Sequence, residues 1–551
     1  MVPDFLAKLR REGEEREAQR KAQKIGIQYL DVSTTPVKLE ALSLVPEEKA
    51  RQIMVAPFQL KGKELGLAAF DTENSGLKKL IEELSHNGYK IDLFIASKTS
   101  IEKLLENYKF VPKAIGEITG KIQIEKNRFE NLLKDLTSIK RIKKSILDFD
   151  FQKAQIGELL EIILAGALNN RVSDIHFETE EKNIRLRYRI DGLLNDVASD
   201  LPKEVYGYLL SRIKLLSGLK LNIQDKPQDG RFSINLEKKS IELRISLIPS
   251  EYGETIVMRI LDPDIIKITL LQLGLRKDDL AIIEEQLKSP NGMILNTGPT
   301  GSGKTTTLYS FLLHKRNPEL KIITIEDPIE YHLEDIEQTQ TDPEAGYTFA
   351  GGLKSIMRQD PDIILIGEIR DEETAEIAIQ ASLTGHSVFS TVHANSAVGA
   401  IPRLLDLKVK PGSIGPALNL IIAQRLVRRL CENCRISKKI LPELKTKIEK
   451  FLGSLPKRIN KNEFSEIKIF EKKGCVQCAG LGYKGRIAIF ELLEINDAME
   501  PLINADVTEV TIKQEAKKQG MVTMQEDGIL KTISGLTTFE EIENVTGPIR
   551  W

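Results

Sequence analysis

The stretch MILNTGPTGSGKTTTLYSFLL, residues 293–313, decides the fold of the largest part of the chain. An apolar strand over Met293–Asn296 leads into a loop with the pattern GxxxxGK[ST], and a helical stretch over Thr306–Leu313 follows it. The loop glycines let successive backbone N–H groups point inward, and the helix adds the positive end of its dipole. This concavity fits a polyphosphate; the alternative is a chance glycine-rich turn.

The polar residues of this loop have predicted roles. Lys304 would neutralise the β and γ phosphates of a bound nucleotide, and the Thr305 hydroxyl would take one position on an octahedral Mg²⁺ ion. The residues expected to bind the nucleotide are Gly298, Pro299, Thr300, Gly301, Ser302, Gly303, Lys304, Thr305 and Thr306.

Two further apolar strands end in carboxylates. The segment IITIEDPIE, residues 322–330, ends with Glu330, and the segment DIILIGEIRD, residues 362–371, carries Glu368. Hydrolysis of a nucleotide needs carboxylates at neighbouring strand ends, to hold Mg²⁺ and to orient the attacking water. We therefore expect Glu330 and Glu368 to take part in the chemistry.

The second of these segments departs from the usual pattern. Many P-loop enzymes have an aspartate where this chain has Gly367, which leaves Glu368 as the acid at that strand end. The nearby Asp371 and Glu373 are expected to cap a helix or to form ordinary ion pairs.

Hydrophobic patterning divides the chain into several segments. The runs GMILNTG, KIITIEDP, DIILIGE and HSVFSTVH alternate with helical stretches, which is typical of a parallel α/β sheet. The predicted segments are a charged helix over 1–24, an α+β domain over 25–111, a charged linker over 112–152, a second α+β domain with antiparallel strands over 153–261, a hinge over 262–274, the α/β domain over 275–430, a four-cysteine element over 431–492 and a helical region over 493–551. The charged residues 5–24 indicate a solvated helix without an assigned function.

Composition excludes some classes of function and leaves others open. The chain has 551 residues, and 79 Lys and Arg nearly cancel 80 Asp and Glu, so no global positive field attracts a nucleic acid. The charged start is not an export signal, which predicts a protein that stays inside the cell. The longest uncharged run near the end, Pro411–Gln424, is too short for a membrane span, so any membrane contact is expected to be peripheral.

The four cysteines form two CxxC pairs. Cys431 and Cys434 make one pair, and Cys475 and Cys478 make the other. Four thiolates suit a tetrahedral Zn²⁺ ion, and such a closed site stabilises a fold and leaves no position for a substrate. The alternative, a redox dithiol, lacks its usual βαβ context.

Taken together, these motifs resemble the secretion-superfamily ATPases that drive type IV pilus assembly and type II secretion. IITIEDPIE looks like that family's Asp box, DPDIILIGEIRD like its atypical Walker B motif, and TGHSVFSTVHAN, residues 384–395, like its His box. The resemblance implies a RecA-like ATPase domain in which Glu330 activates water and Glu368 lies near Mg²⁺. It also implies that His393, together with His386, senses the γ-phosphate.

The second domain resembles the PAS-like domain of the same family. It carries SDIHFE at 173–178, RYRIDG at 187–192 and PQDGRF at 227–232. The resemblance implies that this domain packs over the nucleotide and that Arg231 and Arg244 spread charge on the transferring phosphoryl group. Arginines expected to pair with strand carboxylates are Arg187, Arg189 and Arg259.

The remaining implications concern partners. Residues 41–74 resemble the small N-terminal domain that docks to a membrane platform component in some relatives and binds cyclic di-GMP in others; docking is the expectation here. The family further implies a homohexamer that works in the cytoplasm at the inner face of the membrane with an inner-membrane platform protein. The four-cysteine element favours assembly or secretion over retraction. Rival hypotheses are a DNA-translocating motor or helicase, and a regulatory nucleotide-binding module; no nucleic acid is expected.

Overall fold

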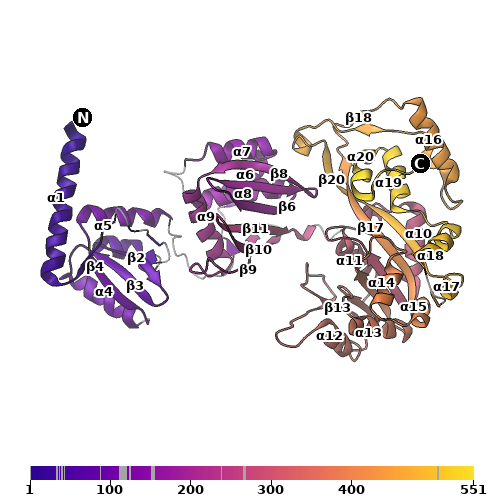
Figure 1. The fold of residues 1–551 in the computed structure, drawn as a ribbon, viewed down its shortest axis with the longest axis horizontal. Helices are drawn as coiled ribbons and strands as arrows, with labels where there is room; N and C mark the ends of the chain where they lie inside the picture. Colours follow the sequence, from indigo (N-terminus) through magenta and orange to yellow (C-terminus); the bar gives the residue numbers. More distant parts are fainter. Residues whose placement is uncertain are drawn as a thin grey trace. The chain divides into compact units, whose positions relative to one another are not determined.

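A computed structural model gives the fold of the chain (Figure 1). It describes residues 2–32, 35, 37–38, 41–42, 44–86, 88–110, 121–122, 126–150, 156–236, 239–264, 268–504 and 508–551. Contacts divide the chain into two compact units, of which the first holds residues 1–190 and 194–260 and the second holds residues 191–193 and 261–551.

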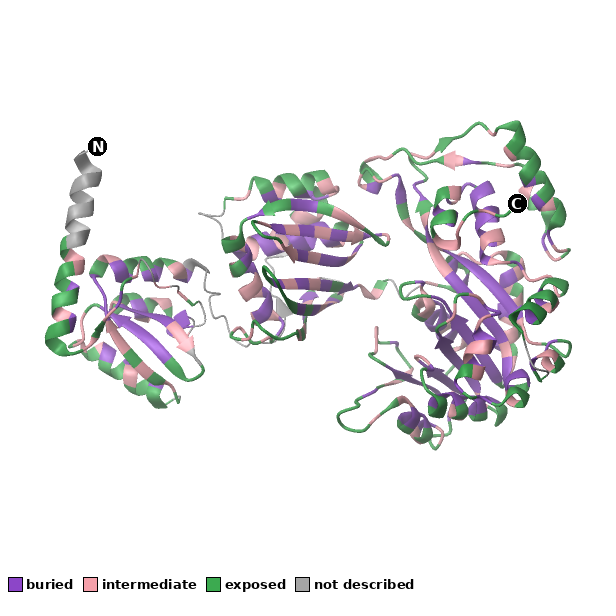
Figure 2. Cartoon of the chain, viewed as in Figure 1, coloured by how far each residue is buried: buried purple, intermediate pink, exposed green. Residues whose placement is uncertain are grey.

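The first unit begins with a small α/β domain around a four-stranded sheet. The sheet has the order β1-β4-β3-β2, in which β2 and β3 form a hairpin and β4 runs parallel to β1 and β3. Its elements are β1 (Gln28–Tyr29), α3 (Glu47–Gln52), β2 (Val55–Lys61), β3 (Glu64–Ala69), α4 (Ser75–His86), β4 (Lys90–Ile95), α5 (Lys98–Leu105) and η1 (Glu106–Phe110). The apolar core lies between the sheet and its helices (Figure 2).

The charged helix α1 (Val2–Ile25) precedes this domain and is fastened to it. The Glu15 carboxylate accepts hydrogen bonds from the hydroxyl groups of Tyr29, Ser97 and Ser100, at 2.6 to 2.7 Å. The adjacent Glu14 accepts a further hydrogen bond from the Thr99 hydroxyl at 2.5 Å. Charge patterning indicates only a solvated helix, because nothing in the sequence separates these two carboxylates from the other charged residues around them.

The second domain of the first unit is a seven-stranded sheet with helices. The strand order is β5-β9-β10-β11-β6-β7-β8, and the β9–β10 and β6–β7 pairs are antiparallel, as the alternating sequences predict. The strands are β5 (Lys121–Ile122), β6 (Val172–Thr179), β7 (Ile184–Ile190), β8 (Leu193–Leu201), β9 (Gln228–Asn235), β10 (Ser240–Ser250) and β11 (Gly253–Leu261), and the helices are α6 (Lys126–Asp135), α7 (Ile139–Leu147), α8 (Ile156–Asn169) and α9 (Lys203–Leu216).

Part of the predicted linker belongs to this second domain. Helices α6 and α7 both pack on α8, and they bury Phe129, Ile142 and Ile146. Arg128 adds an ion pair to Glu158 of α8 at 2.7 Å. The sequence reads as a linker because its apolar residues are few, yet each of these three is completely buried. Residues 111–120, where a hinge is also expected, lie outside the described part.

The second unit is built on the predicted parallel α/β sheet. The order is β14-β13-β15-β16-β12-β17-β20, and every neighbouring pair is parallel except β17–β20. The strands are β12 (Gly292–Thr297), β13 (Ile322–Glu326), β14 (Glu337–Gln340), β15 (Ile363–Ile366), β16 (Ser387–Val392), β17 (Leu418–Leu430) and β20 (Tyr483–Glu494). The helices before the first strand are η3 (Leu270–Leu273) and α10 (Lys277–Lys288), and those between the strands are α11 (Lys304–Lys315), α12 (Phe349–Ile356), α13 (Glu372–Leu383), α14 (Ala400–Asp406) and α15 (Pro411–Ala417). The four central strands are buried throughout, because helices cover both faces (Figure 2).

The four-cysteine element interrupts this unit between β17 and β20. It contains β18 (Ile436–Ser437), α16 (Pro442–Ser454), η4 (Lys461–Phe464), β19 (Phe470–Glu471) and η5 (Val476–Cys478). The sequence analysis extends the element to residue 492, whereas β20 from Tyr483 onward is an edge strand of the ATPase sheet. The apolar sequence of β20 is compatible with either the four-cysteine element or the ATPase sheet. The long antiparallel pairing of β20 with β17 places it in the ATPase sheet.

The last helices are tied to the sheet by buried ion pairs. They are α17 (Glu500–Asn504), α18 (Glu509–Lys518), α19 (Met524–Ile533) and α20 (Phe539–Thr546). Asp527 on α19, which is completely buried, pairs with Lys531 at 2.6 Å and with Arg276 beside α10 at 2.6 Å. The same two side chains reach β20, because Asp527 accepts a hydrogen bond from the Phe490 N–H at 2.8 Å and Lys531 donates one to the Ala488 carbonyl at 2.6 Å. Since breaking the ion pairs would leave a buried charge alone, this cluster holds α19 on the ATPase sheet and beside α10.

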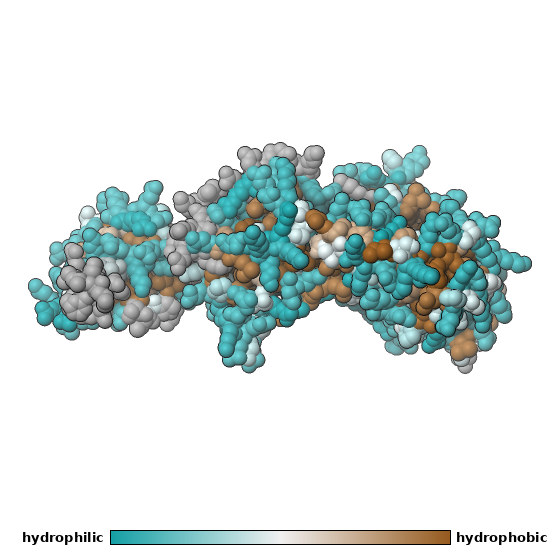
Figure 3. All heavy atoms as spheres, turned by 90° about the horizontal axis from the view of Figure 1, so that it is seen from above, coloured by the Kyte–Doolittle hydropathy of each residue, from teal (hydrophilic) through white to brown (hydrophobic). Residues whose placement is uncertain are grey.

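The described helices are too short or too polar to cross a lipid bilayer. On the face seen in Figure 3, hydrophilic residues cover most of the surface and hydrophobic residues show through in patches.

Candidate active site

The predicted site residues of the ATPase unit gather at one edge of its sheet. In the register of the parallel strands, Thr297 at the end of β12 lies beside Val392 at the end of β16 and beside Ala423 of β17. The carboxyl ends of parallel strands meet at the same edge, which is where open α/β sheets bind ligands. The phosphate loop, the carboxylate of Glu368 and the imidazole of His393 all follow strands at this edge.

The phosphate loop has the backbone that its glycines predict. Gly298, Gly301 and Gly303 have positive φ angles of 145°, 78° and 89°, which favour glycine. A Cβ atom on Gly298 would lie 2.5 Å from the carbonyl oxygen of Gln424. Gly298 is therefore required both by its backbone angle and by the close approach of β17.

Buried side chains of two strands support the loop from below. The Gln424 side chain on β17 donates a hydrogen bond to the Ser302 carbonyl at 2.8 Å and accepts one from the Asn296 amide at 2.8 Å. Both Asn296 and Gln424 are almost completely buried. Hydrogen bonds of this kind fix the loop, because leaving either buried partner unpaired would be costly. Sequence motifs gave no signal for Gln424, which lies more than 120 residues from the loop.

Lys304 opens helix α11 and folds over the loop. Its ammonium group donates hydrogen bonds to the carbonyl oxygens of Gly298 at 2.8 Å and Pro299 at 3.2 Å. Burial lowers the pKa of Lys304, and the charge of nearby Glu368 opposes that shift. The Lys304 ammonium group therefore lies over the loop that would bind the phosphates, and Glu368 is close enough to affect the pKa of Lys304. Thr305 follows it as an exposed residue.

Glu368 stands at the centre of the charged groups at this edge. Its carboxylate lies 3.2 Å from Nε2 of His393 and forms an ion pair with Arg370, whose guanidinium also lies 3.6 Å from the carboxylate of Asp327. The Glu368 side chain is only 15% exposed, whereas His393 and Arg370 are about half exposed. Arg370 was not predicted as a site residue, although it stands two residues after Glu368 in the same segment.

Gly367 is explained by the neighbouring strand. Its N–H donates to the Ile325 carbonyl at 2.8 Å, and a Cβ atom at this position would lie 3.3 Å from that carbonyl oxygen. The chain therefore passes close to β13 here, and an aspartate at this position would crowd it.

Glu326, the last residue of β13, and Glu330, which follows the strand, differ in burial. Glu326 is buried and accepts hydrogen bonds from Tyr309, from Thr324 at 2.7 Å and from Gln338 at 3.1 Å. Burial raises the pKa of Glu326, and these hydrogen bonds oppose the shift. Glu326 is thus part of the core, whereas Glu330 is half-buried and follows the strand end.

His386 lies at the opposite end of β16 from His393. It precedes Ser387, which pairs with Gly292 at the start of β12, and its Nδ1 lies 3.0 Å from the Ala381 carbonyl at the end of α13. A strand of this length separates its two ends by about 16 Å. His386 therefore serves the end of a helix, and the expectation that it acts with His393 is not supported.

Asp371 and Glu373 have the predicted structural roles of a helix cap and an ion-pair partner. Asp371 accepts a hydrogen bond from the Thr374 N–H at 2.8 Å and caps α13, and Glu373 pairs with Lys354 at 2.6 Å. The predicted ion pairs of the second-domain arginines are also present: Arg187 with Glu178, Arg189 with Asp174 at 3.5 Å, and Arg259 with Asp174 at 3.0 Å.

Arg231 and Arg244 are directly opposite each other on β9 and β10 of the first unit. Arg231 is exposed, and Arg244 lies 3.6 Å from the carboxylate of Glu242 on its own strand. The phosphate loop belongs to the second unit, so a role for these arginines at the nucleotide stays a prediction.

The four cysteines form one cluster. The sulfur atoms of Cys431 and Cys475 are 3.9 Å apart, those of Cys434 and Cys478 are 3.7 Å apart, and all four lie within 4.8 Å of one another. Tetrahedral Zn–S bonds of about 2.3 Å require sulfur separations of about 3.8 Å. These distances are also far longer than a disulfide bond.

Backbone groups support a thiolate in this cluster. The N–H groups of Cys475 and Gly482 donate to the Cys478 sulfur at 3.1 and 3.2 Å. Although burial opposes the change, these bonds lower the pKa of Cys478 to about 7. The donor set and its spacing therefore fit a structural Zn²⁺ ion.

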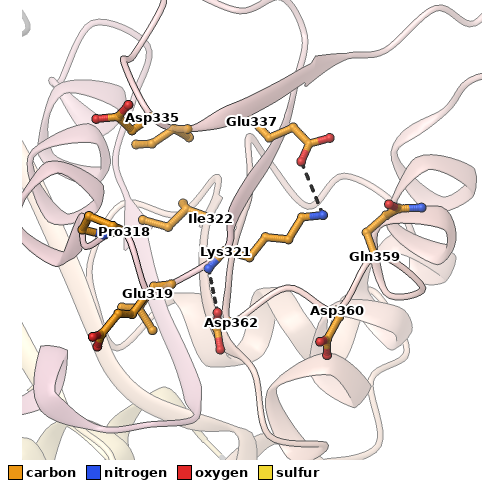
Figure 4. A pocket seen from close by; sticks show the side chains of 11 residues that line it. Pro318, Glu319, Lys321, Ile322, Asp335, Glu337, Gln359, Asp360 and Asp362 are labelled. Carbon is orange, nitrogen blue, oxygen red and sulfur yellow. Dashed lines mark hydrogen bonds and ion pairs between the residues drawn. The ribbon is translucent and has the colours of Figure 1, made fainter.

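A second hollow lies at the other edge of the ATPase sheet and contains none of the predicted site residues. It has a volume of about 860 Å³ and is lined by the start of β13 and by carboxylates (Figure 4). Lys321 lies 3.7 Å from Glu337, and its backbone N–H donates to Asp362 at 2.6 Å.

The phosphate loop, Lys304 and Glu368 define this unit as a P-loop nucleotide triphosphatase. Residues 150–544 match the model of a family described as Type II/IV secretion system protein, and residues 25–110 match that of the MshEN domain. The chain therefore belongs to the type II/IV secretion system protein family, whose matched members include named ATPases.

Two relatives and one solved structure illustrate the match. The type IV pilus assembly ATPase PilB of Myxococcus xanthus (strain DK1622) is 36% identical over 532 residues, which cover 96% of this chain and 90% of the relative. The type II secretion system protein E of Pectobacterium carotovorum subsp. carotovorum is 42% identical over 401 residues, which cover 73% of this chain and 77% of the relative. The structure of the Legionella pneumophila ATPase DotB shares the fold with a TM-score of 0.51 and 21% sequence identity, and the match covers 70% of this chain and 95% of DotB.

Proposed function

We propose that this chain is a motor ATPase that hydrolyses ATP to ADP and phosphate to drive type IV pilus assembly or type II protein secretion. The observation that carries the proposal is the single sheet edge at which the phosphate loop, Lys304, Glu368 and His393 meet. One relative is named as a type IV pilus assembly ATPase and another as a type II secretion system protein, which supports pilus assembly and protein secretion as the two processes that the motor could drive.

The proposed chemical step is in-line attack of water on the γ-phosphate. Glu330 orients the water, and Lys304 takes up charge that develops on the phosphoryl oxygens. Arg231 and Arg244 are proposed to take up further charge, and His393 to sense the γ-phosphate through its contact with Glu368. The Thr305 hydroxyl and the Glu368 carboxylate are hard oxygen ligands that suit Mg²⁺, which would neutralise phosphate charge.

We further propose a homohexamer that docks on an inner-membrane platform protein in the cytoplasm. The family supports this arrangement. Sedimentation with bound nucleotide should give a hexamer; monomer alone at high protein concentration would contradict it.

The N-terminal domain is the proposed docking element, and cyclic di-GMP is its second candidate ligand because residues 25–110 match the MshEN domain model. Titration calorimetry decides between them. Binding of cyclic di-GMP at micromolar concentration or tighter would reverse the order of the two proposals.

The proposed Zn²⁺ site has its own test. We expect one zinc per chain by elemental analysis, and we expect that a strong chelator or Cys434→Ser lowers the midpoint of thermal unfolding. The reason is that the binding free energy of a structural zinc is also folding free energy. Added zinc should restore the chelated protein. A zinc-free chain with an unchanged melting temperature would contradict a structural metal.

The motor proposal is tested by steady-state ATPase activity of the purified chain, alone, with DNA, and with lipid plus the cytoplasmic part of a platform protein. Stimulation by the platform or lipid but not by DNA is the expected result. Stimulation by DNA alone would favour the translocase.

A further inference from the structure

The loop that carries His393 is fastened to the protein at two points. At the first point, the Thr297 hydroxyl donates to the Ala394 carbonyl at 2.9 Å and accepts from the Ala394 N–H at 2.8 Å. At the second point, the Ala397 N–H donates to the carboxylate of Glu491 at 2.8 Å. The loop is thus held between the strand that enters the phosphate loop and the edge strand β20.

Glu491 is an unusual residue for its position. It lies in the interior of β20, is 5% exposed, and has no ion pair with a cation among the described residues. Its second oxygen accepts a hydrogen bond from the Met524 N–H at 3.4 Å, at the start of helix α19. Burying a carboxylate is costly; two N–H groups converge on this one, and the positive charge of Lys513 also favours its ionised form.

The surroundings of Glu491 connect it to the nucleotide edge. It is paired with Ala423 on β17, and the next residue, Gln424, holds the phosphate loop. Burial raises the pKa of Glu491, and the N–H groups of Ala397 and Met524 oppose that shift. No motif in the sequence marks this residue, and the proposed chemistry does not use it.

We propose that Glu491 is a positioning residue for ATP hydrolysis, which holds the loop at Ala397 so that His393 faces Glu368. Glu491 touches no nucleotide in this scheme and acts only through the loop. The inference rests on the proposed role of His393.

A carboxylate suits this task better than its amide. Each of its two oxygens accepts one N–H, from Ala397 and from Met524. In Glu491→Gln one oxygen becomes an NH₂ group that faces an N–H donor, and two donors repel each other. The variant keeps the volume of the side chain but has one acceptor oxygen instead of two, so the N–H groups of Ala397 and Met524 compete for the oxygen that remains.

The experiment measures kcat and KM for ATP in the full chain carrying Glu491→Gln, His393→Ala or both substitutions. We expect Glu491→Gln to lower kcat by about tenfold or more, since small displacements near reacting groups have effects of this size. KM should change less than about twofold, because Gln424 still holds the phosphate loop. Adding Glu491→Gln to His393→Ala should cause no further loss of kcat.

The matched control is Glu494→Gln on the same strand. Glu494 accepts a long hydrogen bond of 3.4 Å from Gln286 and makes no hydrogen bond with the His393 loop within the described part of the chain. We expect wild-type kcat for this variant. Where Glu491→Gln unfolds at the assay temperature, Glu491→Asp, which keeps the charge but shortens the reach, takes its place with the same expected pattern.

The outcomes separate the two proposals. A normal kcat for His393→Ala would overturn the role of His393 and the inference with it. A low kcat for His393→Ala, combined with a normal kcat for Glu491→Gln or with losses that multiply in the double variant, would overturn the inference alone.

Discussion

The two edges of the ATPase sheet both carry carboxylates, yet only one has the parts of a nucleotide site. At the edge of Figure 4, Glu319, Asp335 and Asp360 surround an open hollow, and they are exposed. At the other edge, Glu368 is mostly buried beside a glycine loop, a helix N-terminus and Lys304. Acidic residues alone therefore do not make a phosphate site.

The difference lies in the backbone and in what holds it. Phosphate is recognised by converging N–H groups, which the loop from Gly298 to Thr305 supplies at the start of α11. Gln424 fixes that loop through a buried hydrogen bond to the Ser302 carbonyl, and Thr297 fastens the neighbouring His393 loop at Ala394. At the opposite edge the carboxylates are exposed, Glu337 pairs with Lys321 and Asp335 pairs with Arg316, and the remaining negative charge would repel a nucleotide.

The largest effect is expected for Lys304→Ala. Removal of the ammonium group leaves phosphate charge without its fixed partner, so phosphate release should fall by about a thousandfold or more. Lys321→Ala at the opposite edge is the matched control and should keep wild-type turnover. An equal loss of phosphate release in both variants would contradict the assignment of the nucleotide site to the edge that carries Lys304.

Glu330→Gln should have the next largest effect. The amide cannot activate water, so turnover should fall by at least about a hundredfold while ATP binding is retained. Phosphate release and binding of a fluorescent ATP analogue measure the two quantities. Loss of binding together with turnover would assign Glu330 to the structure of the site instead of to the chemistry.

Gln424→Leu tests the support below the loop. It leaves the Ser302 carbonyl and the Asn296 amide without their buried partner, which should lower the free energy of unfolding by about 2–4 kcal/mol. Urea denaturation measures this quantity. The control is Gln359→Leu, an exposed glutamine at the opposite edge, which should change stability by less than about 0.5 kcal/mol.

Asp362→Asn at the opposite edge should have the smallest effect. Asp362 is exposed and accepts one backbone hydrogen bond from Lys321, which an asparagine oxygen also accepts. We expect unchanged kcat and KM in the ATPase assay. A loss of turnover above about threefold would show that this edge takes part in the cycle.

Local sequence predicted the parts of the fold and site that are local. The phosphate loop, Glu368 and the two CxxC pairs each lie in a short run whose strand, loop and spacing can be read directly. The antiparallel strands of the second domain and the parallel sheet followed from hydrophobic alternation. The family resemblance then ordered these motifs into one site.

What sequence reasoning missed depends on pairing between distant segments. Gln424 and Glu491 matter because β17 lies beside β12 and β20 lies beside β17, and no sequence motif predicts these pairings. His386 and His393 occur in one short run, and only the strand between them places them at opposite edges. Glu326 ends its strand like a catalytic acid, but Tyr309 and Gln338 bury it in the core.

The most direct test of the central claim is amide hydrogen exchange of the full chain with and without a non-hydrolysable ATP analogue and Mg²⁺. The account predicts that the nucleotide protects residues 298–306 and 393–397 and leaves residues 318–322 and 335–337 unchanged. Protection at 318–322 and 335–337, or no protection at the phosphate loop, would contradict it.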